Sequence, residues 1–414
     1  MWIRMTLSTS EISIMFLSLF LLLLFSFIGG KLFERIKAPK VVGEIVGGMI
    51  LGGSCIGFFF PELYSSIFNN FPEQGKILNI FYQLGLVFLM FSSGFNTSIN
   101  ITKKNAKNYF LLFFGATVIP MLLGLLFTNM FTDSFIGTAN NEMAFTFVFI
   151  ISVAITSIPV ISKIFFDIGA MNTNFSNMVL TVSTLQDLCL WILLNMSISL
   201  VETGKFKLTN FLITTTLTIG LLCLVKLVEY IVKKKKITIK NNILSISFLS
   251  TFILIFALSK LNINIMYSAF IAGYFIKSLL PKGSKEIDKI KDFSFSFFVP
   301  IYFALVGIQL DVIHNFSLIR FLIFYIIAFG LEFIGTAGTM FFSKLKKSTI
   351  INLGITMNAR GGPGIVLATT AFAYNIINVE FFTVLIITTM LSSTMAGYWL
   401  RHEQTKNPKV FTDL

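Results

Sequence analysis

The sequence predicts an all-α polytopic membrane protein with about thirteen transmembrane helices. The chain is 55% hydrophobic and only 12% charged, and its mean hydropathy is +0.84. A water-soluble domain needs more charged side chains than this to cover its surface. Apolar runs of about 20 residues, the length that spans a bilayer, also recur along the whole chain.

The apolar runs predict thirteen spans with short loops between them. They lie near 12–30, 41–60, 77–95, 109–131, 143–162, 175–200, 209–232, 242–260, 265–280, 293–310, 317–342, 348–374 and 379–400. The first run has too long an apolar core for a signal peptide, and no small-residue cleavage site follows it, so we expect a helix. We expect one membrane domain over residues 1–414 and no soluble regulatory domain.

The net charge of +13 is interpreted as a signal of membrane topology. Lysine and arginine gather in alternate loops, for example at Lys103/Lys104, at 233–236 and at 344–347, whereas the loops between them hold few. Basic loops stay in the cytoplasm, so we expect the N-terminus outside and the C-terminus inside a cell (inner or plasma) membrane. We expect the lipid bilayer, and no nucleic acid, as a partner.

The sequence carries little that would support an enzyme. Its three cysteines, Cys55, Cys189 and Cys223, fall in expected helices without disulfide or metal-site spacing, and its two histidines are His314 and His402. No glycine-rich segment ends in Gly-Lys-Ser/Thr, as a nucleotide-binding loop would. We therefore expect no catalytic residues, no cofactor and no resident metal.

Four ionisable residues lie within expected spans and away from the span ends, or nearly so: Glu44, Asp187, Glu332 and Arg360. Charges inside a membrane are costly unless they are paired or hydrated, which makes them candidates for function. Asp187 is the strongest candidate, because it is the single acid near the centre of its span. For Arg360 we favour an electrostatic or structural role over direct contact with a substrate. Glu44 lies near the end of its span, where a solvated position is expected.

Two expected spans contain helix-breaking residues. Pro159 lies in span 143–162, preceded by the hydroxyl residues Thr156 and Ser157. The break expected in span 348–374 is formed by Gly361, Gly362, Pro363 and Gly364. A simple kink explains either one alone. The two spans are an odd number of helices apart and run in opposite directions, so together they indicate inverted repeats with an ion site between two broken helices.

Seven segments in order resemble the cation:proton antiporter-2 family of monovalent cation/proton exchangers. They are PKVVGEIVGGMILG (39–52), LGLVFLMFSSGFN (84–96), AITSIPVISKIFFDIGAMNT (154–173), TLQDL (184–188), FIAGYF (270–275), FFVPIYFALVGIQLD (297–311) and GITMNARGGPGIVLAT (354–369). Each segment alone is a weak signal, but their shared order covers essentially the whole chain.

The resemblance implies the sodium/proton antiporter-like fold, with two crossing broken helices. It implies a mobile core of helices at about 109–200 and 317–400, with the remaining helices serving as dimerisation scaffold in a homodimer. It also places the family's ion-binding carboxylate on Asp187, its Thr-Ser pair on Thr156 and Ser157, and its arginine on Arg360.

Three positions bear on the ion and on the charge balance. Gln186 before Asp187 is similar to the potassium-efflux branch, which normally carries a nucleotide-binding domain, so potassium is only mildly favoured and sodium stays open. Asn96 and Glu332 stand where many members have an acid and a lysine, respectively. We hypothesise that Glu332 pairs with Arg360; the alternative is that Glu332 faces a polar cavity without a partner.

The sequence therefore predicts a secondary antiporter that exchanges protons for Na+ or K+. Asp187 would bind either a proton or a dehydrated cation, with Gln186, Thr156, Ser157 and backbone carbonyls completing an oxygen shell. Two alternatives remain open: a sodium- or proton-coupled organic anion transporter of the same fold, and a membrane sensor that does not transport.

Overall fold

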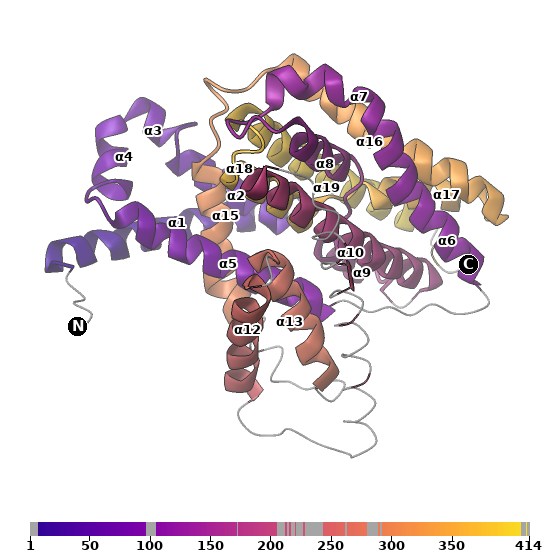
Figure 1. Cartoon of the computed structure of the whole chain (residues 1–414), viewed down its shortest axis with the longest axis horizontal. Coiled ribbons are helices and arrows are strands. Elements are labelled where there is room, and N and C mark those ends of the chain that lie inside the picture. The colour runs from indigo at the N-terminus through magenta and orange to yellow at the C-terminus, as the bar shows by residue number, and fades with distance from the viewer. Residues whose placement is uncertain are drawn as a thin grey trace. The chain divides into compact units, whose positions relative to one another are not determined.

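The computed structural model describes residues 7–96, 105–171, 173–204, 243–260, 263–279 and 292–406, with single positions at 212, 215, 216, 220, 227, 289 and 411. Helices make up nearly all the regular structure of these residues (Figure 1). Their β pairing is limited to an isolated antiparallel bridge between Ile136 and Ile377. Apart from single positions, the span expected at 209–232 lies outside the described residues, as does the side chain of Asn96.

Eight helical segments of the described chain are long and apolar enough to cross a membrane. They are Thr9–Arg35, Lys40–Phe59, Gln74–Phe95, Ala106–Phe135, Glu142–Asp167, Asn174–Thr203, Leu318–Ser343 and Val379–Lys406. Shorter apolar helices lie at Ser245–Ser259, Ile265–Lys277 and Ser294–Ile308. The predicted class, an all-α polytopic membrane protein, is confirmed.

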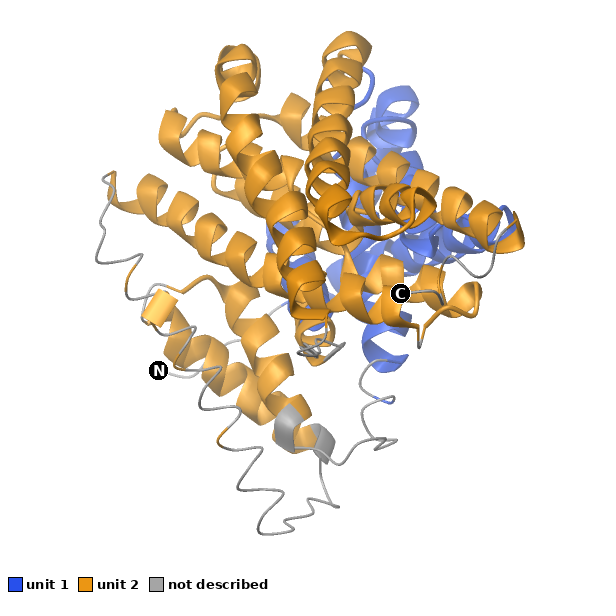
Figure 2. Cartoon of the chain, turned by 90° about the vertical axis from the view of Figure 1, so that its right-hand side faces the viewer, with its two compact units in different colours: residues 1–89, 288–315 blue, residues 90–287, 316–414 orange. Residues whose placement is uncertain are grey.

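The chain divides into two compact units (Figure 2). Unit 1 comprises residues 1–89 and 288–315. Its helices are α1 (Thr9–Arg35), α2 (Lys40–Leu51), α3 (Ile56–Phe59), α4 (Pro61–Phe68), most of α5 (Gln74–Asn96), the π-helix η3 (Ser294–Phe298) and α15 (Val299–Ile308).

Glycines in unit 1 allow its helices to pack backbone against backbone. A β-carbon on Gly43 of α2 would collide with the carbonyl oxygen of Gly29 in α1, and one on Gly48 would collide with that of Ala304 in α15. Small residues of this kind let membrane helices approach closely. The span expected at 41–60 is not one helix, because α2 ends at Leu51 and the short α3 follows.

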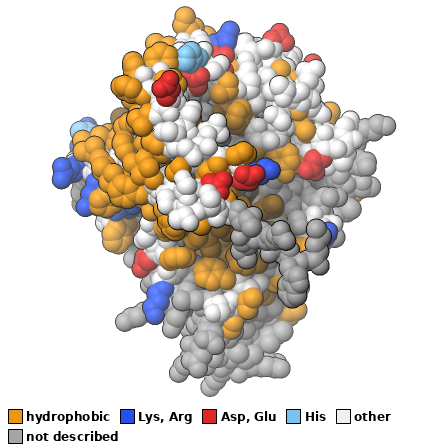
Figure 3. Space-filling view, turned by 90° about the vertical axis from the view of Figure 1, so that its left-hand side faces the viewer, with side chains coloured by type: hydrophobic (Ala, Val, Ile, Leu, Met, Phe, Trp, Pro, Cys, Tyr) orange, Lys and Arg blue, Asp and Glu red, His pale blue; other side chains and the backbone are white. Residues whose placement is uncertain are grey.

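The outward side of α1 is apolar, as a surface in contact with lipid must be. Phe16, Phe20 and Phe27 are 68%, 57% and 53% exposed. The face of the molecule in Figure 3 shows apolar side chains in broad patches with scattered charges. In water such a surface would drive aggregation, whereas in a bilayer it matches the surrounding hydrocarbon.

Unit 2 comprises residues 90–287 and 316–414 and holds Asp187, Glu332, Arg360 and both expected breaks. Its helices are α6 (Ala106–Phe113), the π-helix η2 (Phe114–Val118), α7 (Ile119–Phe135), α8 (Glu142–Val153), α9 (Ile158–Asp167), α10 (Asn174–Thr203), α12 (Ile243–Ser259), α13 (Ile265–Leu279), α16 (Leu318–Met340), the 3₁₀ turn η4 (Phe341–Ser343), α17 (Lys347–Met357), α18 (Gly361–Ala373) and α19 (Val379–Lys406). Glu44 lies in α2 of unit 1, where it is only 4% exposed and pairs with Lys40 at 3.1 Å, so the solvated position expected for it is wrong.

Two membrane segments of unit 2 are broken, as predicted. Residues 154–157 separate α8 from α9, and residues 358–360 separate α17 from α18. The expected positions of the breaks need correction, because Pro159 lies in the first turn of α9 and Gly361, Gly362, Pro363 and Gly364 begin α18. Proline fits a first helical turn, where its missing N–H would have no helical acceptor.

The loop before α8 is hydrogen-bonded to the loop after α18. Gly137 and Ala139, between α7 and α8, donate backbone N–H groups to the carbonyls of Ile376 and Asn375, between α18 and α19, at 2.9 and 3.0 Å. Asn378 donates in the other direction to Phe135 at 3.0 Å. These bonds join the loop before α8, which leads into the first break, to the loop after α18, which follows the second break.

Candidate functional site

The two breaks cross in direct contact. The backbone N–H of Ser157 donates to the carbonyl of Ala359 at 2.6 Å, and the hydroxyl of Thr156 donates to the carbonyl of Met357 at 2.6 Å. Unwound backbone leaves donors and acceptors unpaired, which is costly in an apolar interior. Each break supplies part of what the other lacks.

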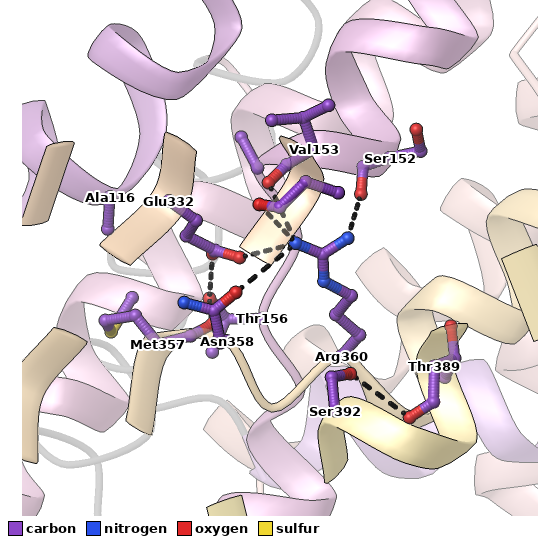
Figure 4. A network of polar contacts seen from close by, with 12 residues as sticks. Ala116, Ser152, Val153, Thr156, Glu332, Met357, Asn358, Arg360, Thr389 and Ser392 are labelled. Carbon is purple, nitrogen blue, oxygen red and sulfur yellow. Dashed lines mark hydrogen bonds and ion pairs between the residues drawn. The ribbon is translucent and has the colours of Figure 1, made fainter. Parts of the chain in front are cut away.

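Arg360, in the second break, binds the end of the helix before the first break (Figure 4). Its Nη1 donates to the carbonyl of Ser152 at 2.7 Å, and its Nη2 lies 3.3 Å from that of Val153. The last carbonyls of a helix have no helical donor and carry partial negative charge. A guanidinium that is only 1% exposed therefore finds a stabilising environment at the end of α8.

Arg360 also forms the ion pair expected with Glu332 of α16. Arg360 Nη2 lies 3.1 Å from Glu332 Oε2, and the Glu332 side chain is fully buried. The Thr156 hydroxyl also lies 3.3 Å from Glu332 Oε1, so its single proton is shared between the Met357 carbonyl and this carboxylate. Glu332 thus has partners from both breaks, so the alternative of an unpartnered Glu332 is wrong.

The helices after the breaks begin with hydroxyl caps. The Ser157 side chain accepts from the N–H of Val160 at 3.4 Å in α9, and Ser393 of α19 accepts from the N–H of Gly361 at 2.9 Å in α18. Gly361 has φ of +42°, in the left-handed region that favours glycine, and a β-carbon there would collide with the Ser157 side chain. Glycine is therefore required where the breaks cross.

Asp187 lies near the middle of α10 and is 1% exposed. Within the described part of the chain, neither of its carboxylate oxygens has a hydrogen-bond partner. A buried carboxylate in this state differs sharply from Glu332, which is bound on both oxygens. The structure shows no hydrogen bond from Asp187 to Thr156 or Ser157.

Gln186 reaches the first break from the same helix. Its amide nitrogen lies 2.9 Å from the carbonyl of Ala154, in the break, and 3.0 Å from the carbonyl of Ala116, in η2. Its amide oxygen is buried and has no hydrogen-bond partner among the described residues. The nitrogen of this side chain, not its oxygen, makes the protein contacts.

The structure therefore gathers most of the predicted residues into one network. Sequence reasoning missed Asn358, whose Oδ1 lies 3.4 Å from Arg360 Nη2, and the Ser393 cap. Asn358 directly precedes the Ala-Arg-Gly-Gly segment, so its position beside Arg360 could have been predicted from the sequence. No sequence feature indicates that Ser393 caps α18. Among the described residues, no group of three His, Cys, Asp or Glu side chains could hold a metal ion.

Comparison with known proteins assigns a family to this arrangement. The family model for the transmembrane part of sodium/hydrogen exchangers matches residues 19–402, which is most of the chain. The chain belongs to the sodium/hydrogen exchanger family. The fold of this exchanger-family chain is similar to that of the sodium proton antiporter MjNhaP1 from Methanocaldococcus jannaschii, with a TM-score of 0.63 at 14% identity over 95% of this chain and 99% of that one.

Several curated relatives match over nearly the same region. The Na(+)/H(+) antiporter NhaS4 of Synechocystis sp. is 25% identical, with 89% of this chain and 92% of the relative aligned. An Na(+)/H(+) antiporter of Enterococcus hirae is 23% identical over 92% and 96% of the two chains. Cation/H(+) antiporter 19 of Arabidopsis thaliana is 22% identical over 91% of this chain, which spans only 48% of that relative's length.

Proposed function

We propose that this chain is a secondary antiporter that exchanges protons for a monovalent cation, Na+ or K+, at the carboxylate of Asp187. The observation that carries the proposal is the Asp187 side chain itself: buried, near the middle of a membrane helix, and without a hydrogen-bond partner among the described residues. The names of the sodium/proton and cation/proton antiporter relatives support the same activity.

The physical argument concerns the cost of an isolated charge. An ionised carboxylate in a low-dielectric interior is strongly disfavoured unless a proton or a cation neutralises it. Asp187 would therefore hold one or the other, and the two would compete for it. Only the neutralised site would move between the two sides of the membrane, and this couples the two fluxes without any covalent step.

The other residues of the network have supporting roles in this proposal. The hydroxyl oxygens of Thr156 and Ser157 in the first break remain the proposed additional ligands of the cation. Glu332 and Arg360 neutralise each other, which leaves Asp187 as the carboxylate free to exchange. The organic-anion alternative is weakened, because the deep guanidinium of Arg360 is already engaged with Glu332 and with the carbonyls of α8.

The test is proton flux in proteoliposomes driven by Na+, K+ or Li+ gradients. The wild type should exchange at least one of these cations, and Asp187→Asn, which cannot lose a proton, should abolish exchange while insertion and folding are retained. Asp133→Asn is the matched control, because Asp133 is an exposed acid of α7. Near-normal exchange by Asp187→Asn would refute the mechanism, and a wild type without cation-driven flux would favour the sensor alternative.

A further inference from the structure

Gln186 makes two hydrogen bonds that its neighbour Asp187 does not share. Its amide nitrogen lies 2.9 Å from the Ala154 carbonyl oxygen and 3.0 Å from the Ala116 carbonyl oxygen, and the side chain is fully buried. A glutamine amide nitrogen carries two N–H donors. These two hydrogen bonds go to backbone carbonyls that lie 32 and 70 residues away in the chain, and the same side chain also faces the Glu332 carboxylate of α16.

The two carbonyls lack their usual helical donors for separate reasons. In an α-helix the carbonyl of Ala116 would accept from residue 120, but Pro120 has no N–H, and the chain forms a π-helix over Phe114–Val118 at this place. The carbonyl of Ala154 belongs to the unwound residues after α8. Buried carbonyls that lose their usual α-helical donor are costly, so hydrogen bonds from the Gln186 amide stabilise both of them.

One side chain thus ties three parts of unit 2 together. Through Gln186, α10 is held against η2 on one side and against the first break on the other. Asp187 is the next residue of α10, so the two Gln186 hydrogen bonds also set where the Asp187 carboxylate lies relative to the first break. A shift of about 1 Å in such a group is enough to impair a binding or reaction site.

We propose that Gln186 is a positioning residue, which fixes the first break and the π-helix against α10 through its amide N–H groups. The proposal rests on the antiport function assigned above, because it concerns the geometry of the same site. It gives the amide N–H groups of Gln186 a role that was not expected from the sequence, where only the side-chain oxygen was considered.

Substitution by glutamate separates the two roles, because glutamate has nearly the same shape. If Gln186 binds the cation through oxygen, an added carboxylate should strengthen cation binding at alkaline pH. If Gln186 holds the carbonyls of Ala116 and Ala154 through its N–H groups, an ionised glutamate has no donor to offer them. Its oxygens would then face both carbonyl oxygens and the Glu332 carboxylate. A protonated glutamate keeps one donor, so part of the function should return at acid pH.

The first experiment compares cation-dependent exchange by the wild type and Gln186→Glu in proteoliposomes across a range of pH. We expect the apparent KM for the cation to rise about tenfold relative to the wild type at alkaline pH, the factor that about 1.4 kcal/mol represents. The ratio of variant to wild-type KM should fall as the pH is lowered. A KM below that of the wild type at alkaline pH would overturn the proposal. Gln309→Glu, at the exposed glutamine that directly follows α15, is the control and should show no such trend.

The second experiment measures thermal unfolding in detergent and needs no transport. The Tm of Gln186→Glu should fall relative to the wild type as the pH rises. Gln186→Met, which keeps the volume but removes both donors, should lower the Tm at every pH. Wild-type stability of Gln186→Met would overturn the proposal. If the wild type showed no exchange, the antiport assignment would fail. The Tm measurements would still decide whether the Gln186 hydrogen bonds hold α10 to the first break and to η2.

Discussion

The Arg360 guanidinium binds backbone carbonyls as well as the carboxylate of Glu332. Its two Nη atoms contact the carbonyls of Ser152, Val153 and Ala328 together with the Glu332 carboxylate. A lysine ammonium could not reach this spread of acceptors, because it lacks the fixed fork of the guanidinium. The arginine therefore stabilises the end of α8 and the position of α16 at the same time.

The Glu332–Arg360 pair predicts a coupling that can be measured. Glu332→Gln and Arg360→Gln should each lower the free energy of unfolding by about 3–5 kcal/mol, because each leaves a buried charge uncompensated. The double variant should lose less than the sum of the two. Thermal unfolding in detergent measures all three variants, and strictly additive losses would show that the pair is not coupled.

The exposed pair between Arg320 and Glu380 is the natural comparison. It joins the same two residue types at 2.7 Å, but the arginine side chain is 48% exposed. Ion pairs at a surface contribute about 0–1 kcal/mol. Arg320→Gln and Glu380→Gln should therefore have small effects, alone and together.

Single residues differed in how far the sequence could predict them. Asp187, Glu332 and Arg360 stand out, because ionisable groups are rare in apolar spans, and the pairing of Glu332 with Arg360 could be proposed from charge alone. The contacts of Gln186 could not be, since its acceptors are backbone carbonyls that any residue type provides. Only the folded arrangement brings those carbonyls to α10.

The broken helices show that the residues marking a break need not be the unwound ones. Pro159 and Pro363 lie in first turns, and the unwound residues precede them at 154–157 and 358–360. The sequence therefore predicts each break to within a few residues. The π-helix at Phe114–Val118 was missed, although the proline that follows it at position 120 is a signal for disrupted helical hydrogen bonding.

The crossing of the breaks predicts a strict requirement at Gly361. Gly361→Ala places a β-carbon against Ser157 and forces a residue with a side chain to adopt φ of +42°. We expect a loss of about 1–3 kcal/mol in stability, together with reduced exchange. Thermal unfolding and proteoliposome flux measure the two effects.

Gly338→Ala provides the matched control within unit 2. Gly338 lies in α16, where an added β-carbon meets no described atom within 4 Å. Alanine is the better helix former, so this variant should be neutral or slightly stabilised. Equal effects at the two glycines would mean that the crossing does not constrain position 361.

The whole chain carries a charge asymmetry that predicts its orientation in the membrane. A fluorescent protein fused after Leu414 should lie in the cytoplasm. In a background without the native cysteines, Asn140→Cys should react with a membrane-impermeant thiol reagent from outside, because Asn140 lies in the exposed loop between α7 and α8. Lys347→Cys, at the start of α17, should react only after the cells are opened. The reverse labelling pattern would contradict the thirteen-span topology.

At the scale of the molecule, hydropathy was sufficient to predict the class and most of the helices. It could not predict that the helix of the second span would be interrupted after Leu51, where Gly52 lies close to the backbone of Ile308, more than 250 residues later in the chain. The resemblance to monovalent cation/proton exchangers is confirmed at the level of the family. The homodimer and the division into mobile core and scaffold stay predictions.

The long sequence separation between Arg360 and the carbonyl that it binds has a consequence for the synthesis of the chain. Its partner carbonyl at Ser152 lies 208 residues earlier in the chain. At a synthesis rate of about 5–20 residues per second, the ribosome needs about 10–40 s to make the residues between them. The carbonyls at the end of α8 are therefore made well before the guanidinium that binds them, and until Arg360 is made these polar groups need another hydrogen-bond donor.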